Sequence, residues 1–312
     1  MDARPRAYPI SPHPPATAPA AGIASGFLSA LSALVVLVKL RVVLLLMLSS
    51  FGGALLASGG RLATGNLILL LVTGFLSASG ASALNQYLER DLDARMRRTH
   101  KRPLASGYFS RPEAVLEAGI YLILLAVLIA LPFNVMLTLF LILGALTYVG
   151  IYTMWLKSRT LLNIVIGGAA GSFAVLSGSA AAGNWAHPTA VGLALLIFVW
   201  TPIHFWSLAQ AYRDDYAGTS IPMLPALVGG RASAGWIALH AGATILIGLL
   251  LSVDPALGWL YLLPVSLGGL WLGSLSIRLI FTPTRTQALK LFNVSNIYLG
   301  LVLLAICGGT LL

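Results

Sequence analysis

The sequence predicts an all-α protein, a polytopic membrane bundle of nine transmembrane helices around a central cavity. Of its 312 residues, 58% are hydrophobic and only 9% are charged, whereas a soluble domain carries about 25% charged residues. Nine apolar stretches approach or exceed the roughly 20 residues that a helix needs to cross a bilayer. The basic residues gather in the gaps on one side of these stretches, as expected for a protein that threads the membrane repeatedly.

The nine spans follow one another with short gaps, none large enough for a soluble domain. We expect them at 34–57, 66–90, 114–131, 135–156, 161–182, 189–211, 233–252, 257–280 and 289–311. The third and fourth are split at Pro132, because one helix of about 43 residues would be too long for a single crossing. Residues 1–25 are rich in Pro and Ala, so we expect a disordered cytoplasmic tail followed by one membrane domain over 26–312.

The distribution of charge predicts how the bundle is oriented. Nine spans place the two termini on opposite sides, and the gaps on the N-terminal side hold every Lys and Arg except Arg61. The positive-inside rule therefore predicts a cytoplasmic N-terminus. We expect a multi-pass protein of the cytoplasmic (inner) membrane of a bacterium, with its active site facing the cytoplasm. The net charge of +10 arises at these span ends, so we do not expect nucleic acid to bind.

The densest charge cluster follows the second span. Asn85, Glu89 and Asp93 are spaced four residues apart, so they line one face of a helix, with Asp91 on an adjoining face. Counted from residue 66, the helix would be about 42 Å long at its acidic end, beyond a hydrocarbon core of about 30 Å. Hard oxygen ligands at such an interface suit magnesium, which takes its other ligands from water and phosphates. Ordinary salt bridges with the neighbouring arginines are the alternative.

A second polar cluster ends the sixth span. His204 and Asp215 are eleven residues apart, about 20° from eclipsed in a continuous helix, so we expect both on one wall. Asp214 and Asp215 open the following gap. Acidic motifs at two helix ends on one side of the membrane predict two metal sites that flank one pyrophosphate. His204 lies inside a span and is a functional candidate for that reason, with a hydrogen-bonded packing residue as the alternative.

These motifs resemble the UbiA superfamily of intramembrane prenyltransferases. The Asn85-x-x-x-Glu89-x-x-x-Asp93 pattern matches the family's first aspartate-rich motif, and residues 102–107 (Arg-Pro-Leu-Ala-Ser-Gly) are similar to its following loop. Residues 152–157 (Tyr-Thr-Met-Trp-Leu-Lys) are similar to the family's stretch between spans four and five. Two further segments together point to the branch of the family that acts on haem: 204–209 (His-Phe-Trp-Ser-Leu-Ala) and 221–225 (Ile-Pro-Met-Leu-Pro).

The resemblance implies transfer of the farnesyl group of farnesyl diphosphate to a vinyl group of haem b, which gives haem O. It implies Mg²⁺ bound with the diphosphate, and haem b as a substrate rather than a cofactor. The implied catalytic residues are Asn85, Glu89, Asp93, Asp215 and His204. The implied metal ligands are Asn85, Glu89, Asp91, Asp93, Asp214 and Asp215. The residues implied to bind substrates are Lys39, Arg41, Arg97, Lys101, Arg102, Lys157, Arg159, Asn163, Tyr152 and Trp206.

Several points stay open at the level of sequence. His204 could bind the haem iron, orient a propionate or steer a proton, and either Asp214 or Asp215 could be the metal ligand. A haem A synthase or terminal-oxidase assembly proteins are candidate partners, beside the lipid bilayer.

Three other functions also remain possible. A related prenyltransferase with an aromatic acceptor, such as a quinone or chlorophyll precursor, would carry the same first motif. A transporter would place its ionisable groups near the midplane, where only His204 and His240 are expected here. A non-catalytic haem-handling protein would not need the carboxylate of Asp93.

Overall fold

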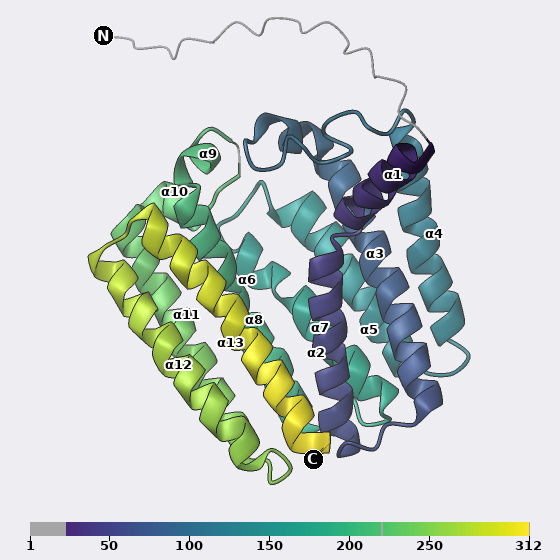
Figure 1. The fold of residues 1–312 in the computed structure, drawn as a ribbon, viewed down its shortest axis with the longest axis vertical. Coiled ribbons are helices and arrows are strands. Elements are labelled where there is room, and N and C mark those ends of the chain that lie inside the picture. Colours follow the sequence, from purple (N-terminus) through teal and green to yellow (C-terminus); the bar gives the residue numbers. More distant parts are fainter. Residues whose placement is uncertain (1–22, 220, 312) are drawn as a thin grey trace, which may run out of the picture.

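A computed structural model describes residues 23–219 and 221–311 of the chain. This part of the protein is helical, without a β-strand, and forms an elongated bundle (Figure 1). Nine of its helical segments are long and apolar enough to cross a membrane. The predicted all-α membrane fold is therefore confirmed.

The spans have the following bounds in the structure. They are α2 (Leu40–Ser58), α3 (Thr64–Arg95), α4 (Pro112–Ala130), α5 (Val135–Ala145) continued by the π-helix η1 (Leu146–Leu156), α6 (Asn163–Gly167) continued by α7 (Ala169–Ala181), α8 (Pro188–Ala211), α11 (Gly230–Leu250) continued by the 3₁₀-helix η2 (Leu251–Val253), α12 (Gly258–Phe281) and α13 (Arg285–Leu311). Three shorter helices accompany them: α1 (Ile23–Leu37), α9 (Arg213–Ala217) and α10 (Leu224–Val228).

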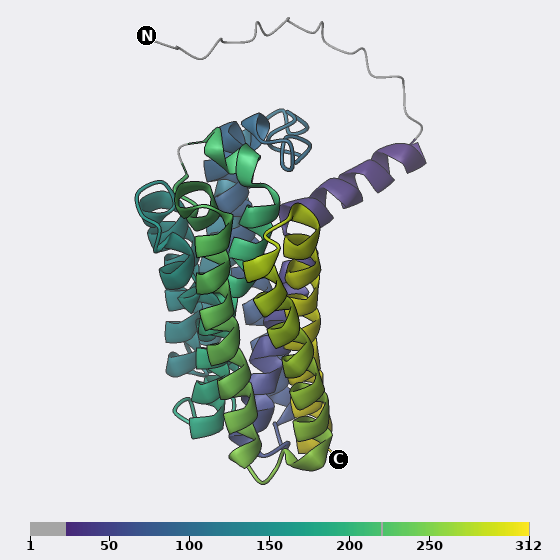
Figure 2. The ribbon, with the colours of Figure 1, turned by 90° about the vertical axis from the view of Figure 1, so that its left-hand side faces the viewer.

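The start of the first span differs from the prediction. We expected it at residue 34, but the chain breaks before α2 because Lys39 adopts a left-handed conformation with φ 50° and ψ 52°. Residues 34–37 therefore belong to α1, which leaves the bundle at an angle (Figure 2). Residues 23–25, expected in the tail, are the first turn of α1. The rest of the expected tail, residues 1–22, lies outside the described residues.

The predicted split between the third and fourth spans is confirmed, and a polar side chain explains it. Asn134 precedes α5, and its Oδ1 accepts a hydrogen bond from the backbone N of Leu137 at 2.8 Å, which satisfies a donor at the start of that helix. Its Nδ2 donates to the carbonyl oxygen of Ala180 at 2.8 Å. The turn is thereby tied to the end of α7.

Close packing of neighbouring helices rests on small residues. The principal neighbours are α3 with α4, α2 with α7, α8 with α11, and α12 with α13. Between α2 and α7, a Cβ on Gly178 would overlap the carbonyl oxygen of Ser50, and a Cβ on Gly53 would lie 2.9 Å from Cγ1 of Val175. Only glycine at both positions lets these two backbones approach so closely.

One end of the bundle gathers the segments that carry charge. The loop after α3, the junction of α1 with α2, and helices α9 and α10 all lie there (Figure 1). At this end α8 stops at Ala211, because Tyr212 leaves helical geometry with φ −115° and ψ 33°. Asp215 therefore belongs to the separate helix α9. The expectation that His204 and Asp215 share the wall of one continuous helix was wrong.

Candidate active site

Three polar side chains of α3 form the centre of the site. Asn85, Glu89 and Asp93 are exposed by only 2%, 7% and 3%, and α3 runs without interruption through all three. A carboxylate buried in a medium of low polarity must be paired with a cation or it loses its charge. The arrangement therefore requires positive groups from elsewhere in the chain.

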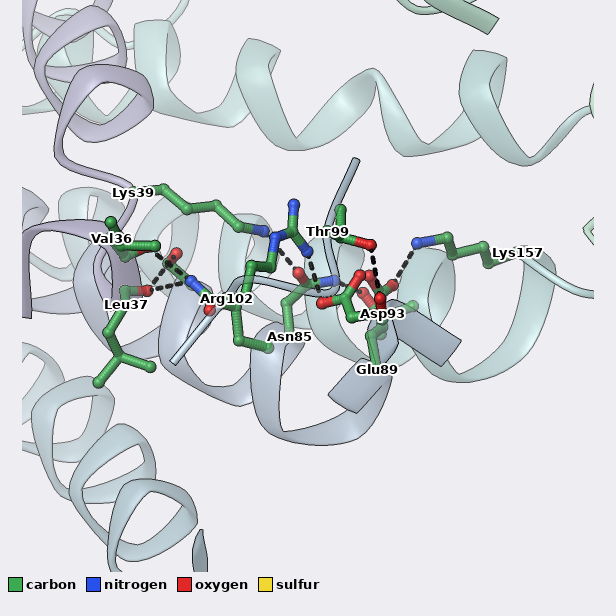
Figure 3. Close-up of polar contacts among 12 residues, drawn as sticks. Val36, Leu37, Lys39, Asn85, Glu89, Asp93, Thr99, Arg102 and Lys157 are labelled. Carbon is green, nitrogen blue, oxygen red and sulfur yellow. Dashed lines mark hydrogen bonds and ion pairs between the residues drawn. The ribbon is translucent and has the colours of Figure 1, made fainter. Parts of the chain in front are cut away.

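Three separate segments supply those positive groups, one to each side chain (Figure 3). Lys39 Nζ donates to Asn85 Oδ1 at 2.6 Å. Lys157 Nζ donates to Glu89 Oε1 at 2.5 Å. Arg102 Nη1 donates to Asp93 Oδ2 at 2.6 Å. The predicted acidic face and three of the predicted substrate-binding bases are thus brought together as matched pairs.

The junction between α1 and α2 orients the side chain of Lys39 toward Asn85. The left-handed backbone at Lys39 is held from α3, where Nε2 of Gln86 donates to the carbonyl oxygens of Val36 and Leu37 at 2.7 and 2.8 Å. Burial lowers the pKa of Lys39 to about 7, with the nearby charge of Arg102 as the next cause. Additional negative charge beside this amine would favour its protonated form.

The π-helix η1 orients the side chain of Lys157 toward Glu89. In an α-helix, about 100° per residue would place Lys157 roughly opposite Tyr148, nine positions earlier. In η1 the bonds instead run over five residues, for example from the backbone N of Lys157 to the carbonyl oxygen of Tyr152 at 2.9 Å. This wider winding returns Lys157 to the face of Tyr148 after about two turns. The rings of Tyr148 and Tyr152 stack on that face, 6.0 Å apart.

The turn after α3 places Arg102. Thr99 is 1% exposed, and its Oγ1 donates to the backbone oxygen of Asp93 at 3.0 Å. The backbone N of Arg102 then donates to the carbonyl oxygen of Thr99 at 2.9 Å. This chain of bonds folds the guanidinium back onto the end of α3. The sequence gives Thr99 and Gln86 no functional signal of their own, because each acts on backbone atoms that only the folded chain brings near.

Asn163 stabilises the backbone of the segment that carries Lys157. It is fully buried, and its Nδ2 donates to the carbonyl oxygens of Thr160 and Lys157 at 2.7 and 3.3 Å. These bonds fix the turn that follows η1. Its Oδ1 has no hydrogen-bond partner among the described residues and remains an available acceptor.

Other predicted residues lie apart from the buried trio. Asp91 has an 86% exposed side chain whose Oδ1 is 3.9 Å from Nε of Arg90, so it faces solvent and its expected place among the metal ligands is not supported. The remaining predicted bases are also exposed: Arg41, Arg97, Lys101 and Arg159.

Two pockets open at this end of the bundle, and the two acidic motifs line different ones. Asp214 and Asp215 line a pocket of about 370 Å³ with Arg95, Met96 and Arg97. Asp215 is the less exposed of the two acids. Within 23–219 and 221–311, no three His, Cys, Asp or Glu side chains lie close enough to hold a metal by themselves. The prediction of two metal sites that flank one pyrophosphate therefore stays a prediction, with one acidic motif at each pocket.

The second pocket, of about 330 Å³, combines charge with apolar surface. Glu89, Lys157 and Thr153 line it together with apolar side chains and one more hydroxyl: Leu88, Leu92, Met154, Ile221 and Ser158. It therefore offers an ionic wall beside a hydrophobic one.

His204 lies in a separate aromatic cluster between α8 and α13. Its ring stacks between Trp200 and Phe292, with centroids 4.7 and 4.4 Å away, and its Nδ1 is 3.3 Å from Ser295 Oγ. Ser295 Oγ donates its only proton to the carbonyl oxygen of Phe292 at 2.8 Å, so it must accept from the imidazole. In the neutral ring this contact places the proton on Nδ1 and leaves the lone pair on Nε2.

Trp206 does not join this cluster. Its ring meets the ring of His240 edge to face at 5.3 Å, so it packs toward α11 rather than α13. Its Nε1 has no acceptor within the part of the chain that the structure describes. The predicted contact of Trp206 with substrate remains a prediction.

Comparisons with known proteins agree with the fold and the motifs. The model of the UbiA prenyltransferase family matches residues 45–299. A protein of Saccharolobus islandicus (strain Y.G.57.14 / Yellowstone #1) named protoheme IX farnesyltransferase is 42% identical over 266 residues, which cover 85% of this chain and 92% of that protein.

Solved structures share the architecture at low sequence identity. A structure described as digeranylgeranylglyceryl phosphate synthase has a TM-score of 0.75 at 17% identity, over 91% of this chain and 99% of that one. A UbiA homolog from Archaeoglobus fulgidus bound to DMAPP and Mg²⁺ has a TM-score of 0.62 at 12% identity, over 88% and 98% of the two chains. At these identities the likeness concerns the fold alone.

The pair of Lys157 and Glu89 makes a testable prediction about stability. Replacing Lys157 by Met should lower the free energy of unfolding by about 3–5 kcal/mol, because Glu89 is left buried without its cation. The double variant Lys157→Met/Glu89→Gln should recover most of that loss. Thermal unfolding of the detergent-purified protein measures both. Equal destabilisation of the single and double variants would contradict this account of the pair.

Proposed function

This chain belongs to the UbiA prenyltransferase family, and on that premise we propose that it transfers the farnesyl group of farnesyl diphosphate to a vinyl group of haem b, which gives haem O. The observation that carries the proposal is the 42% identity, over 85% of this chain, to a protein named protoheme IX farnesyltransferase. The segment that contains His204 and the segment 221–225 support the choice of haem as acceptor.

The buried trio fits a divalent metal by the chemistry of its donors. Asn85, Glu89 and Asp93 offer hard oxygens, and one oxygen of each residue already faces a positive group. Magnesium accepts a few protein ligands and completes its shell with water and phosphate oxygens, so a third carboxylate is not needed. When bound with the diphosphate, the metal would neutralise the charge that develops on the leaving oxygen. Asp215 is our candidate ligand on the opposite side.

The three bases have a second role in this proposal. Lys39, Arg102 and Lys157 neutralise the trio in the structure described here. Each is a long side chain that can turn to a phosphate oxygen once the acids hold another cation. The pocket beside Glu89 and Lys157 suits a prenyl diphosphate, because its ionic wall adjoins apolar side chains.

The reaction then breaks the C1–oxygen bond of the farnesyl diphosphate, the π bond of the vinyl group and one O–H bond of water, and it forms one C–C and one C–O bond. The bond between C1 of the farnesyl group and the diphosphate oxygen breaks, and its electron pair leaves with the diphosphate. The vinyl group attacks the resulting allylic cation, and water adds the hydroxyl group and releases a proton. The stacked rings of Tyr148 and Tyr152 lie beside the centre, where they can shield the cation from water.

We assign His204 to the acceptor. Its Nε2 lone pair and the flat faces of Trp200 and Phe292 suit a porphyrin whose iron accepts a nitrogen ligand. In this proposal the acceptor is held by α8 and α13, while the donor is held by α3 and η1.

The mass of the product tests the proposed reaction. The purified protein, incubated with haem b, farnesyl diphosphate and magnesium, should yield haem with the mass of an added hydroxyl and farnesyl group, detected by mass spectrometry. Asp93→Asn should lower the rate by more than about a hundredfold, as expected for loss of one charge-stabilising group. Asp91→Asn should change it little, because Asp91 faces solvent.

Prenylation of a hydroxybenzoate but not of haem would contradict the proposed acceptor. Equal loss of rate in the Asp91 and Asp93 variants would contradict the proposed centre.

Binding of haem makes a separate prediction. His204→Ala should weaken haem b binding by at least about tenfold and change the Soret absorption, because the iron loses a nitrogen ligand. His100→Ala is the matched control, since His100 is exposed and its Nδ1 lies 2.8 Å from the carbonyl oxygen of Arg97 in its own turn. Unchanged Soret spectra and affinity for His204→Ala would rule out an iron contact.

We also propose that the charged end of the bundle faces the cytoplasm. The support is the clustering of nearly all Lys and Arg at that end of the spans. A cysteine placed at exposed Ser106, in a Cys307→Ser background, should react with an impermeant maleimide in inverted membrane vesicles and not in right-side-out spheroplasts. The opposite labelling pattern would reverse the orientation.

A further inference from the structure

Thr153 makes two hydrogen bonds that fix the direction of the amide of Asn85. Its Oγ1 donates to the carbonyl oxygen of Tyr148, five residues earlier in η1, at 2.8 Å. The same oxygen is 2.9 Å from Nδ2 of Asn85, which donates to it. A hydroxyl has one proton, and this one is committed to the backbone, so Thr153 can meet Asn85 only as an acceptor.

The oxygen end of the Asn85 amide faces Lys39, which acts as a donor rather than an acceptor. Lys39 Nζ donates to Asn85 Oδ1 at 2.6 Å, and in its ammonium form it has no lone pair with which to accept a hydrogen bond. Thr153 and Lys39 therefore favour the same orientation of the Asn85 amide, with its NH₂ group toward Thr153 and its oxygen toward Lys39. This orientation matters because magnesium and similar hard cations bind an amide through its oxygen.

We propose that Thr153 is a positioning residue that presents the oxygen of Asn85 to the metal. The inference rests on the proposed function, which places a divalent ion at Asn85. Lys39 cannot keep the amide in place during turnover if it turns to the diphosphate. Thr153 can, because its own bond to Tyr148 ties it to η1. Without that acceptor, nothing on the Thr153 side holds the amide, and its NH₂ group can rotate toward the ion.

The test compares two substitutions in the full-length, detergent-purified protein. Thr153→Val keeps the shape of the side chain and removes the acceptor, whereas Thr153→Ser keeps the hydroxyl. Manganese(II) serves as the probe, and its affinity is measured by electron paramagnetic resonance in the presence of inorganic pyrophosphate. We expect Thr153→Val to weaken manganese binding by about tenfold and Thr153→Ser to stay within about threefold of the unsubstituted protein, as for partners that orient a metal ligand.

A second background separates positioning from a purely structural role. In Asn85→Asp the side chain ends in two equivalent oxygens, so its orientation no longer matters. Adding Thr153→Val to Asn85→Asp should then cost less than about twofold in manganese affinity. A tenfold loss in that background as well would show that Thr153 acts through the stability of η1 and would overturn the proposal.

The outcomes also separate this inference from the proposed function. Manganese binding that Thr153→Val leaves unchanged would overturn the positioning role while the metal site stands. Failure of the unsubstituted protein to bind manganese with pyrophosphate would overturn both.

Discussion

Buried negative charge at the end of α3 is the constraint on which the rest of the site depends. Glu89 and Asp93 are almost inaccessible to solvent, and an unpaired carboxylate in such surroundings costs several kcal/mol. The chain meets this requirement by bringing one base to each acid and a third base to Asn85. The need to place these three basic groups beside the acids therefore explains the backbone path of three segments: the α1–α2 junction, η1 and the turn after α3.

Two of those segments have irregular backbone, and each irregularity has a structural compensation. The left-handed conformation of Lys39 costs about 1–2 kcal/mol for a residue with a Cβ, and Gln86 stabilises it by satisfying carbonyl oxygens at the end of α1. The π-helix is stabilised in the same way by Thr153, which satisfies a carbonyl one turn earlier. Such backbone within a membrane protein is tolerated where protein groups satisfy its hydrogen bonds, and it is common at functional sites.

The same constraint suits the proposed chemistry. The positive and negative groups of the centre are already gathered when a charged substrate arrives, so binding only exchanges partners among groups that lie close together, and charges placed in advance are the main source of electrostatic catalysis. The bases that neutralise the acids are also the groups that could receive the phosphates. His204 draws its contacts from α13, so the proposed acceptor site is built by other helices than the ionic centre.

The sequence by itself determined the features that depend on neighbouring residues along the chain. The spans follow from local hydropathy, and the common face of Asn85, Glu89 and Asp93 follows from the period of an α-helix. Tertiary structure alone decided the π-winding that turns Lys157 toward Glu89 and the break that puts Asp215 in its own helix. The site depends on hydrogen bonds and charge pairs between residues far apart in the chain, 68 positions for Lys157 and Glu89 and 109 for Lys39 and Tyr148, and no local pattern encodes such partners.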